Sequence, residues 1–114
     1  MKIIVEEVVG SNAISMQSGR NLYEKIHAPL IASEHVELDF SGVELFASPF
    51  FNASIGLLLQ DIKLENLQRD MNIINLSTFG RQLLNLVIEN AIKYYAMDAA
   101  SDANLNEIIK NSDD

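Results

Sequence analysis

The sequence contains no cysteine, and only two of its 114 residues are histidine. Without cysteine the chain can build neither a disulfide framework nor a thiolate metal site, and it offers no thiol nucleophile. Basic residues are also scarce, since sixteen acids against eight bases leave a formal net charge of −8. Such a field repels phosphate backbones and anionic lipid, so nucleic acid and membrane surfaces are not expected partners, whereas a basic protein is compatible with it.

Long hydrophobic runs are absent too, and no apolar stretch approaches the length of a membrane-spanning helix. The first ten residues contain one lysine and an apolar stretch that Glu6 and Glu7 interrupt, which indicates a strand and not a secretory signal. We therefore expect a soluble, cytoplasmic protein. The length favours one domain with a modest single core.

The segment from Val36 to Gly56 organises the rest of the chain. Apolar residues alternate with acids over Val36–Phe40, the period-2 pattern of a strand with one face in a core. A Ser-Gly turn follows, and the chain then enters a helix. Ser48 is suited to the N-cap of this helix and Pro49 to its first position, where no N–H is needed.

The helix after Ser48 is predicted to be the longest, from Pro49 to about Gln68. Apolar residues cover most of its circumference, so a broad face should be buried. A single polar stripe remains, formed by Asn52, Gly56, Gln60 and Lys63. A glycine in this stripe would let another backbone approach closely, and packing against the core is the alternative role for Gly56.

The other elements follow from periodicity. Ile3–Val9 is predicted to form a strand, and Ala13–Met16 is predicted to form the second strand of a hairpin. An amphipathic helix begins near Ser18 and ends or bends at Pro29. Met71–Leu76 is a nearly continuous apolar strand of the kind found inside α/β sheets. Ser77-Thr78 then caps an amphipathic helix that extends to residue 95.

The C-terminal part is small and acidic. Residues 97–104 read as a linker, after which Leu105, Ile108 and Ile109 give a short amphipathic helix that would dock on the domain or allow a homodimer. The last four residues should be disordered. We therefore predict an α/β domain over residues 1–96 and a separate linker, helix and tail over 97–114.

Catalytic patterns are missing from the chain. No nucleophile-base pair, P-loop, dinucleotide fingerprint or His-Glu-x-x-His motif occurs, so an enzyme is not expected. His27 and His35 lack a short ligand spacing and are interpreted as surface residues, so neither a metal nor a cofactor is predicted. Asp39, at the end of the central strand, is interpreted as surface charge. The alternative function is a small-molecule or nucleotide-binding module with its pocket beside Asp39 and Ser41.

The stretch VELDFSGVELFASPFFNASIGLLL resembles the STAS domains of anti-sigma-factor antagonists. The later stretch NIINLSTFGRQLLNLVIENAIKYYA is still more similar to the STAS-like family of unknown function, small bacterial proteins or domains sometimes joined to, or encoded beside, histidine-kinase-type ATPases. Together the likeness covers about Val36 to Ala96. It implies a mixed sheet of three to four strands covered by helices, and a non-enzymatic module of signalling or transcriptional regulation.

The resemblance also implies a docking surface and a switch. STAS domains bind a protein partner through the helix after a serine-bearing turn, and phosphorylation of that serine releases the partner in some members. On this sequence the implied docking residues are Ser48, Asn52, Gly56 and Gln60, with a histidine-kinase-type ATPase or another regulator as partner. The antagonists carry Asp-Ser-Ser-Gly where this chain has Ala47-Ser48-Pro49-Phe50. Only Ser48 keeps a hydroxyl, so its phosphorylation is an open question.

Overall fold

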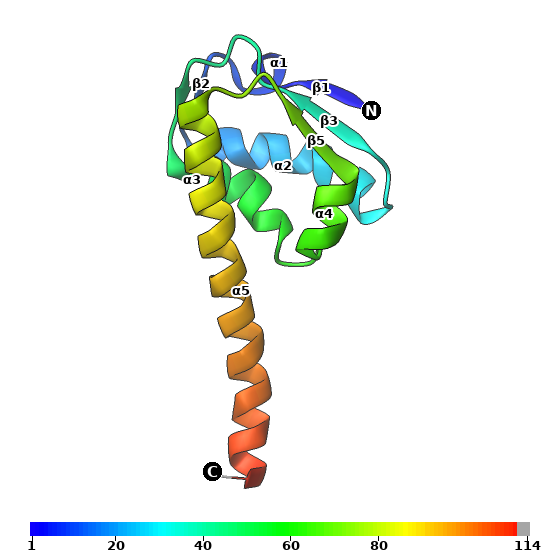
Figure 1. The fold of residues 1–114 in the computed structure, drawn as a ribbon, viewed down its shortest axis with the longest axis vertical. Coiled ribbons are helices and arrows are strands. Elements are labelled where there is room, and N and C mark those ends of the chain that lie inside the picture. The colour runs from blue at the N-terminus through cyan, green and yellow to red at the C-terminus, as the bar shows by residue number, and fades with distance from the viewer. Residues whose placement is uncertain (112–114) are drawn as a thin grey trace.

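The computed structural model describes residues 1–111, and the side chains of residues 1–95. Its elements in chain order are β1 (Lys2–Ile4), α1 (Val5–Val9), β2 (Asn12–Ala13), α2 (Met16–Ile31), β3 (Val36–Asp39), β4 (Leu45–Phe46), α3 (Ser48–Phe51), the π-helix η1 (Asn52–Gly56), α4 (Leu64–Asp70), β5 (Met71–Ile74) and α5 (Thr78–Asn111). Figure 1 shows α5 leaving the body of the domain, which accounts for overall dimensions of 54 × 27 × 23 Å.

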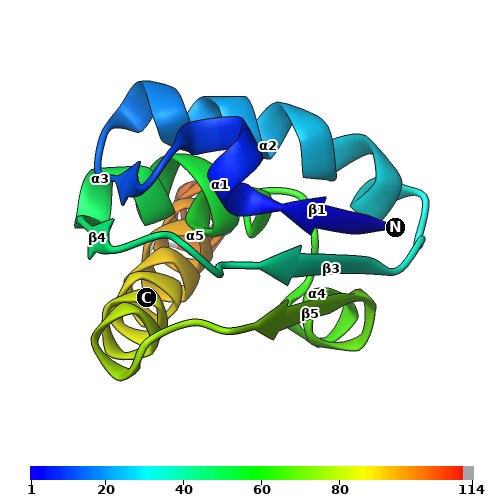
Figure 2. The same cartoon turned by 90° about the horizontal axis from the view of Figure 1, so that it is seen from above.

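Three strands form the main sheet in the order β1-β3-β5, and β2 and β4 form a second, two-stranded sheet. Figure 2 shows β3 between β1 and β5. The register places Ile3 beside Leu38 and Leu38 beside Ile73, and these side chains share the face that meets the helices. Lys2 and Glu37 lie on the opposite face, where their charged groups are 3.8 Å apart.

The predicted α/β class, with strands covered by helices, is confirmed. Each strand pair in residues 1–111 is parallel, where a mixed sheet was expected. The reason lies in the connections. Each pair is joined through at least one helix, and a helical crossover returns the chain to the same end of the sheet before the next strand begins.

The helices pack against one another as well as on the sheet. α2 packs on α3 and η1, and α5 packs on the same two elements from the other side. The closest approach is at Gly19 of α2, where a Cβ atom would collide with the Phe50 carbonyl oxygen and lie 2.8 Å from the Ala53 Cβ. The core beneath them contains, among its fully buried residues, Leu22, Ile26, Leu38, Phe40, Phe50, Phe51, Ile55 and Leu58.

The N-terminal strand is shorter than predicted. β1 ends at Ile4 because its neighbour β3 ends at Asp39, the register partner of Ile4. A strand beyond that point would have no ladder to join, so the chain turns into α1, which satisfies its backbone internally and still buries Val5. Tertiary context thus overrides the β propensity of the valines.

The predicted N-terminal hairpin is wrong. Asn12–Ala13 does form a strand, but β2 pairs in parallel with β4, more than thirty residues later in the chain. Gly10 ends α1 with a φ of 81°, and this turn directs the chain toward β4 instead of back along β1.

The long helix predicted from Pro49 to Gln68 is interrupted. α3 passes into η1 and ends after Leu58, a turn follows, and α4 begins at Leu64. The turn lets α4 start in a new direction before β5, which a straight helix could not do. The longest helix is α5, which includes residues 97–104, so these are helical where a linker was predicted. The side chains of Leu105, Ile108 and Ile109 lie outside the described part of the chain. Of the tail predicted to be disordered, residues 111–114, Asn111 is the last residue of α5, and residues 112–114 lie outside the described residues.

Candidate functional site

The candidate binding surface is an exposed ridge formed by α3 and η1, residues 48–56. Pro49 and Asn52 are exposed along it, while their neighbours Phe50, Phe51 and Ala53 are buried. A groove of about 340 Å³ separates the ridge from α2, and its walls include Met16, Arg20, Pro49, Asn52, Ala53 and Leu57. A second groove of about 310 Å³ separates the ridge from α5, and its walls are Asn52, Gly56, Asn90, Ala91, Tyr94 and Tyr95. Asn52 lines both grooves.

The π-helical segment explains the shape of the ridge. Over Asn52–Gly56 the backbone hydrogen bonds span one residue more than in an α-helix, so each turn is wider. The Ser54 hydroxyl donates to the Phe50 carbonyl oxygen at 2.8 Å inside this segment, and it is fully buried. π-helical turns are rare and occur often at functional sites, which makes this segment a candidate on its own geometry.

Gly56 is buried, although it was predicted to lie in an exposed polar stripe. A Cβ atom built at Gly56 would lie 3.2 Å from the Val87 Cγ1 and 3.9 Å from the Ala91 Cβ of α5. Side chains of helix α5 of the same chain therefore pack on Gly56, which is the alternative packing role and not an approach by another backbone. Asn52 and Gly56 both line the second groove, and Gly56 is buried because α5 covers this part of η1.

Ser48 and Gln60 are both accessible to solvent. Ser48 is not the N-cap that was predicted, and Gln60 does not lie in a helix as predicted. The N-cap of α3 is Ala47, and the half-buried Ser48 is the first helical residue, so its hydroxyl does not cap the helix. Pro49 accordingly occupies the second helical position. Gln60 is exposed in the turn after η1 and lines neither groove. Of the four predicted docking residues, only Ser48 and Asn52 are therefore accessible on the ridge, and Ser48 lies at its N-terminal end.

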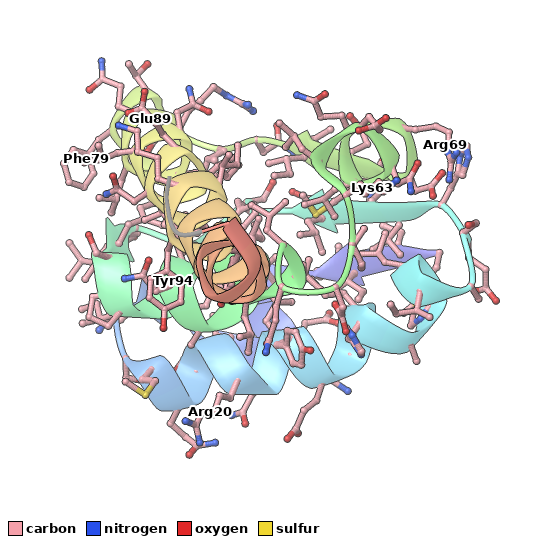
Figure 3. All side chains as sticks on the ribbon, turned by 90° about the horizontal axis from the view of Figure 1, so that it is seen from below. Arg20, Lys63, Arg69, Phe79, Glu89 and Tyr94 are labelled. Carbon is pink, nitrogen blue, oxygen red and sulfur yellow. The ribbon has the colours of Figure 1, made fainter. Side chains whose placement is uncertain are left out.

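Two large apolar side chains flank the ridge and were not singled out from the sequence. Met16 of α2 is 55% exposed, and Tyr94 of α5 is 65% exposed. Ser15 caps α2 by accepting a hydrogen bond from the Ser18 N–H at 3.0 Å, which starts the helix early enough to place Met16 at the groove. Figure 3 shows Tyr94 on the flank of α5 beside the α3 segment, and Arg20 directed outward from α2. The sequence did contain a signal for Tyr94. Two successive residues of a helix point in different directions, so Tyr94 and Tyr95 could not both lie on the buried face.

Asp39 was predicted to be surface charge but is buried, and with Ser41 it forms a closed polar cluster at the end of β3. The Asp39 Oδ1 accepts from the Asn75 side chain at 3.0 Å, from the Ser41 N–H at 2.9 Å and from the Ser41 hydroxyl at 2.7 Å. The Lys2 Nζ lies 3.7 Å from the Asp39 Oδ2. These contacts, the Asn75 bond foremost, lower the pKa of Asp39 from 3.8 to about 2. Neither groove beside the ridge includes Asp39 or Ser41, and the cluster instead ties the ends of β3 and β5 together.

Both histidines pair with aspartates. The His27 Nε2 lies 2.9 Å from the Asp61 Oδ2, and the His27 ring stacks on Tyr23 with centroids 4.8 Å apart. The His35 Nε2 lies 3.4 Å from Asp70, which also accepts two hydrogen bonds from Arg69. Within the described part of the chain, no group of three His, Cys, Asp or Glu side chains could hold a metal ion. None of the described helices is both long and apolar enough to cross a membrane.

Comparisons with known proteins place the ridge in a family context. The family described as a STAS-like domain of unknown function matches residues 18–79, a segment that includes α2 from Ser18 onward, β3, the whole ridge and β5. No match was found among curated proteins or among solved structures. The match covers none of the α5 wall of the second groove, because Asn90, Ala91, Tyr94 and Tyr95 lie beyond it, and Met16 of the first groove lies before it.

Proposed function

The chain belongs to the family of STAS-like domains of unknown function, and on this premise we propose that it is a non-enzymatic module that docks a partner protein on the ridge of α3 and η1. The STAS resemblance supports a role in bacterial signalling or transcriptional regulation. The same resemblance supports a histidine-kinase-type ATPase or another regulator as the partner.

The observation that carries this proposal is the grooved ridge with its exposed apolar flanks. Met16 and Tyr94 leave more than half of their surface in solvent on either side of Asn52. Methionine, arginine and aromatic residues are enriched in protein interfaces, where they fill pockets and exclude water. A raised helix between two grooves can receive side chains of a partner on both sides, so it offers more contact area than a flat helix face.

Charge supports a protein partner of basic character. The net charge of −8 raises the local concentration of positively charged partners around the domain. Arg20 is the only charged residue among the described residues that line the two grooves. Long-range attraction would therefore speed the encounter, while apolar and amide contacts at Asn52 and its neighbours would hold the complex.

The proposal is tested by partner capture and then by quantitative binding to the purified partner. Asn52→Arg places a long charged side chain at the junction of the two grooves, where it blocks both. Gln82→Arg is the matched control, because it makes a similar amide-to-arginine change at an exposed position of α5 outside both grooves.

We expect Asn52→Arg to raise the Kd of the complex at least about tenfold, which corresponds to about 1.4 kcal/mol. Gln82→Arg should bind like the parent, and both variants should melt at the parent's temperature because both sites are exposed. Equal binding by all three proteins would refute docking on the ridge. A rise in melting temperature with a metabolite, abolished by Asn52→Arg, would instead favour a small ligand in the grooves.

A further inference from the structure

The edge strand β5 has the composition of an internal strand. Its sequence, Met71–Ile74, contains no charge and no proline, and the sequence pattern predicts a strand with neighbours on both sides. The structure nevertheless places β5 at the edge of the sheet, with β3 on one side only. Edge strands usually carry lysine, proline or a bulge that discourages pairing with another chain. The uncharged edge of β5 has none of these features.

One residue of β5, Ile73, directs both its backbone N–H and its C=O toward the open edge of the sheet. The Phe40 N–H donates to the Ile74 carbonyl oxygen at 3.0 Å, so Ile74 faces β3. Because peptide groups alternate along a strand, Asn72 also faces β3, while the N–H and C=O of Ile73 point outward. Met71 points outward as well, but its N–H already donates to the Leu67 carbonyl oxygen at the end of α4.

A groove of about 320 Å³ runs beside this edge, between α4 and α5. Core residues form its floor, since Leu67 is 1% exposed and Leu84 is 2% exposed. Ile73 shares the inward face with Leu38, its register partner, yet Leu38 is fully buried and Ile73 only half-buried. The inward face of the sheet is therefore less covered at Ile73 than at Leu38, as it would be in a sheet that lacks its next strand.

We propose that a second copy of this chain occupies the groove, with β5 of each copy pairing antiparallel across a two-fold axis at Ile73. In an antiparallel pair, two opposed residues can exchange both N–H···O=C bonds, and Ile73 offers both groups outward. The two-fold places Ile73 opposite Ile73 of the other copy, and the two side chains pack together over the open core. The two three-stranded sheets become one six-stranded sheet.

Charge favours a second copy despite the acidity of the chain. None of the described residues that line the groove is acidic, although the sequence contains sixteen acids, and Arg81 is the one charged residue among them. Two copies can therefore meet at this face without opposing carboxylates. The isologous arrangement needs no other surface, because each copy supplies the same strand and the same groove.

The register at Ile73 yields a charge-swap experiment. Ile73→Lys and Ile73→Glu each place like charges opposite one another across the two-fold, so each variant alone should lose the dimer, with a Kd raised about a hundredfold or more. An equimolar mixture places lysine opposite glutamate and should form a heterodimer. Light scattering after size-exclusion chromatography measures the molar mass, which is the 12.7-kDa chain mass for a monomer and twice that for a dimer. Leu86→Lys, at an exposed apolar residue outside the groove, is the control and should remain dimeric.

The expected pattern is a dimeric parent, two monomeric variants with native circular dichroism, and a dimeric mixture. A parent that stays monomeric throughout its soluble concentration range overturns the proposal. So does a dimer that persists in both single variants, because another surface would then form it. A mixture that stays monomeric overturns the register at Ile73. Asn52→Arg should leave the dimer intact, so failure of this proposal and failure of docking on the ridge are separate results.

Discussion

Replacement of Gly19 by alanine is expected to push α2 away from the ridge that it supports. The added methyl group would collide with the Phe50 carbonyl oxygen and lie 2.8 Å from the Ala53 Cβ. The oxygen belongs to the backbone, and Ser54 already donates a hydrogen bond to it. Neither neighbour is the flexible end of a side chain, so relief requires a movement of one whole helix relative to the other.

Two opposing terms determine the magnitude. Alanine gains about 1 kcal/mol over glycine in a helix interior, because it restricts the unfolded chain more. Overpacking of a filled core costs about 1–3 kcal/mol, and contact with backbone belongs in the upper part of that range. We expect a net loss of about 1–2 kcal/mol in the free energy of unfolding, which corresponds to roughly 5–10 °C in Tm for a domain of this size.

Thermal and urea denaturation followed by circular dichroism measure this loss. Gly56→Ala is the matched control, because its methyl group would lie 3.2 Å from both the Phe51 carbonyl oxygen and the Val87 Cγ1, distances that a small shift relieves, whereas the methyl group at Gly19 would collide with a backbone oxygen. Its stability should change by less than about 0.5 kcal/mol. If Gly19→Ala melts at or above the parent temperature, the close packing of α2 on the ridge is not a constraint, and the reasoning fails.

Three further predictions concern the other site residues. Asn75→Ala should raise the pKa of Asp39 from about 2 toward 3.8, because the Asn75 bond is the largest cause of its depression; carboxyl titration by NMR checks this. In the parent, ionised Asp39 stabilises the fold above pH 3.8, and this contribution is lost as the pH falls through about 2. Ser48→Glu should leave Tm unchanged, because the Ser48 hydroxyl caps nothing, and should weaken partner binding; a lower Tm would restore a structural role to Ser48. Gly56→Arg should unfold the domain in a melting experiment, because Val87 occupies the space above it, and a native melt would contradict the packing of α5.

The alternating strand and the last helix were predictable because each buries one face against a large partner. Val36, Leu38 and Phe40 are all buried, as their period-2 spacing predicts. In α5, Leu84 and Val87 are buried, and the Ser77 hydroxyl accepts from the Gly80 N–H at 3.0 Å as an N-cap does. Local pattern and tertiary environment agree at these positions, so the pattern alone was sufficient.

The candidate site was predicted only in part. Ser48 and Asn52 of the ridge were named from the sequence, but Gly56 was assigned to solvent because nothing in the local pattern shows that α5 covers it. Met16 and Tyr94 were missed because their exposure depends on where α2 and α5 lie relative to the ridge. No periodicity within one helix contains that information.

The sequence by itself determined which residues are apolar, where the central strand lies and where the last helix begins, and that the domain is acidic and has no cysteine. These properties depend on each residue and its near neighbours. Tertiary structure decided where β1 stops, which strand β2 joins, that β5 lies at an edge, and that α5 covers Gly56. Those outcomes depend on contacts between segments far apart in the chain, and such contacts exist only once the helices and strands have packed.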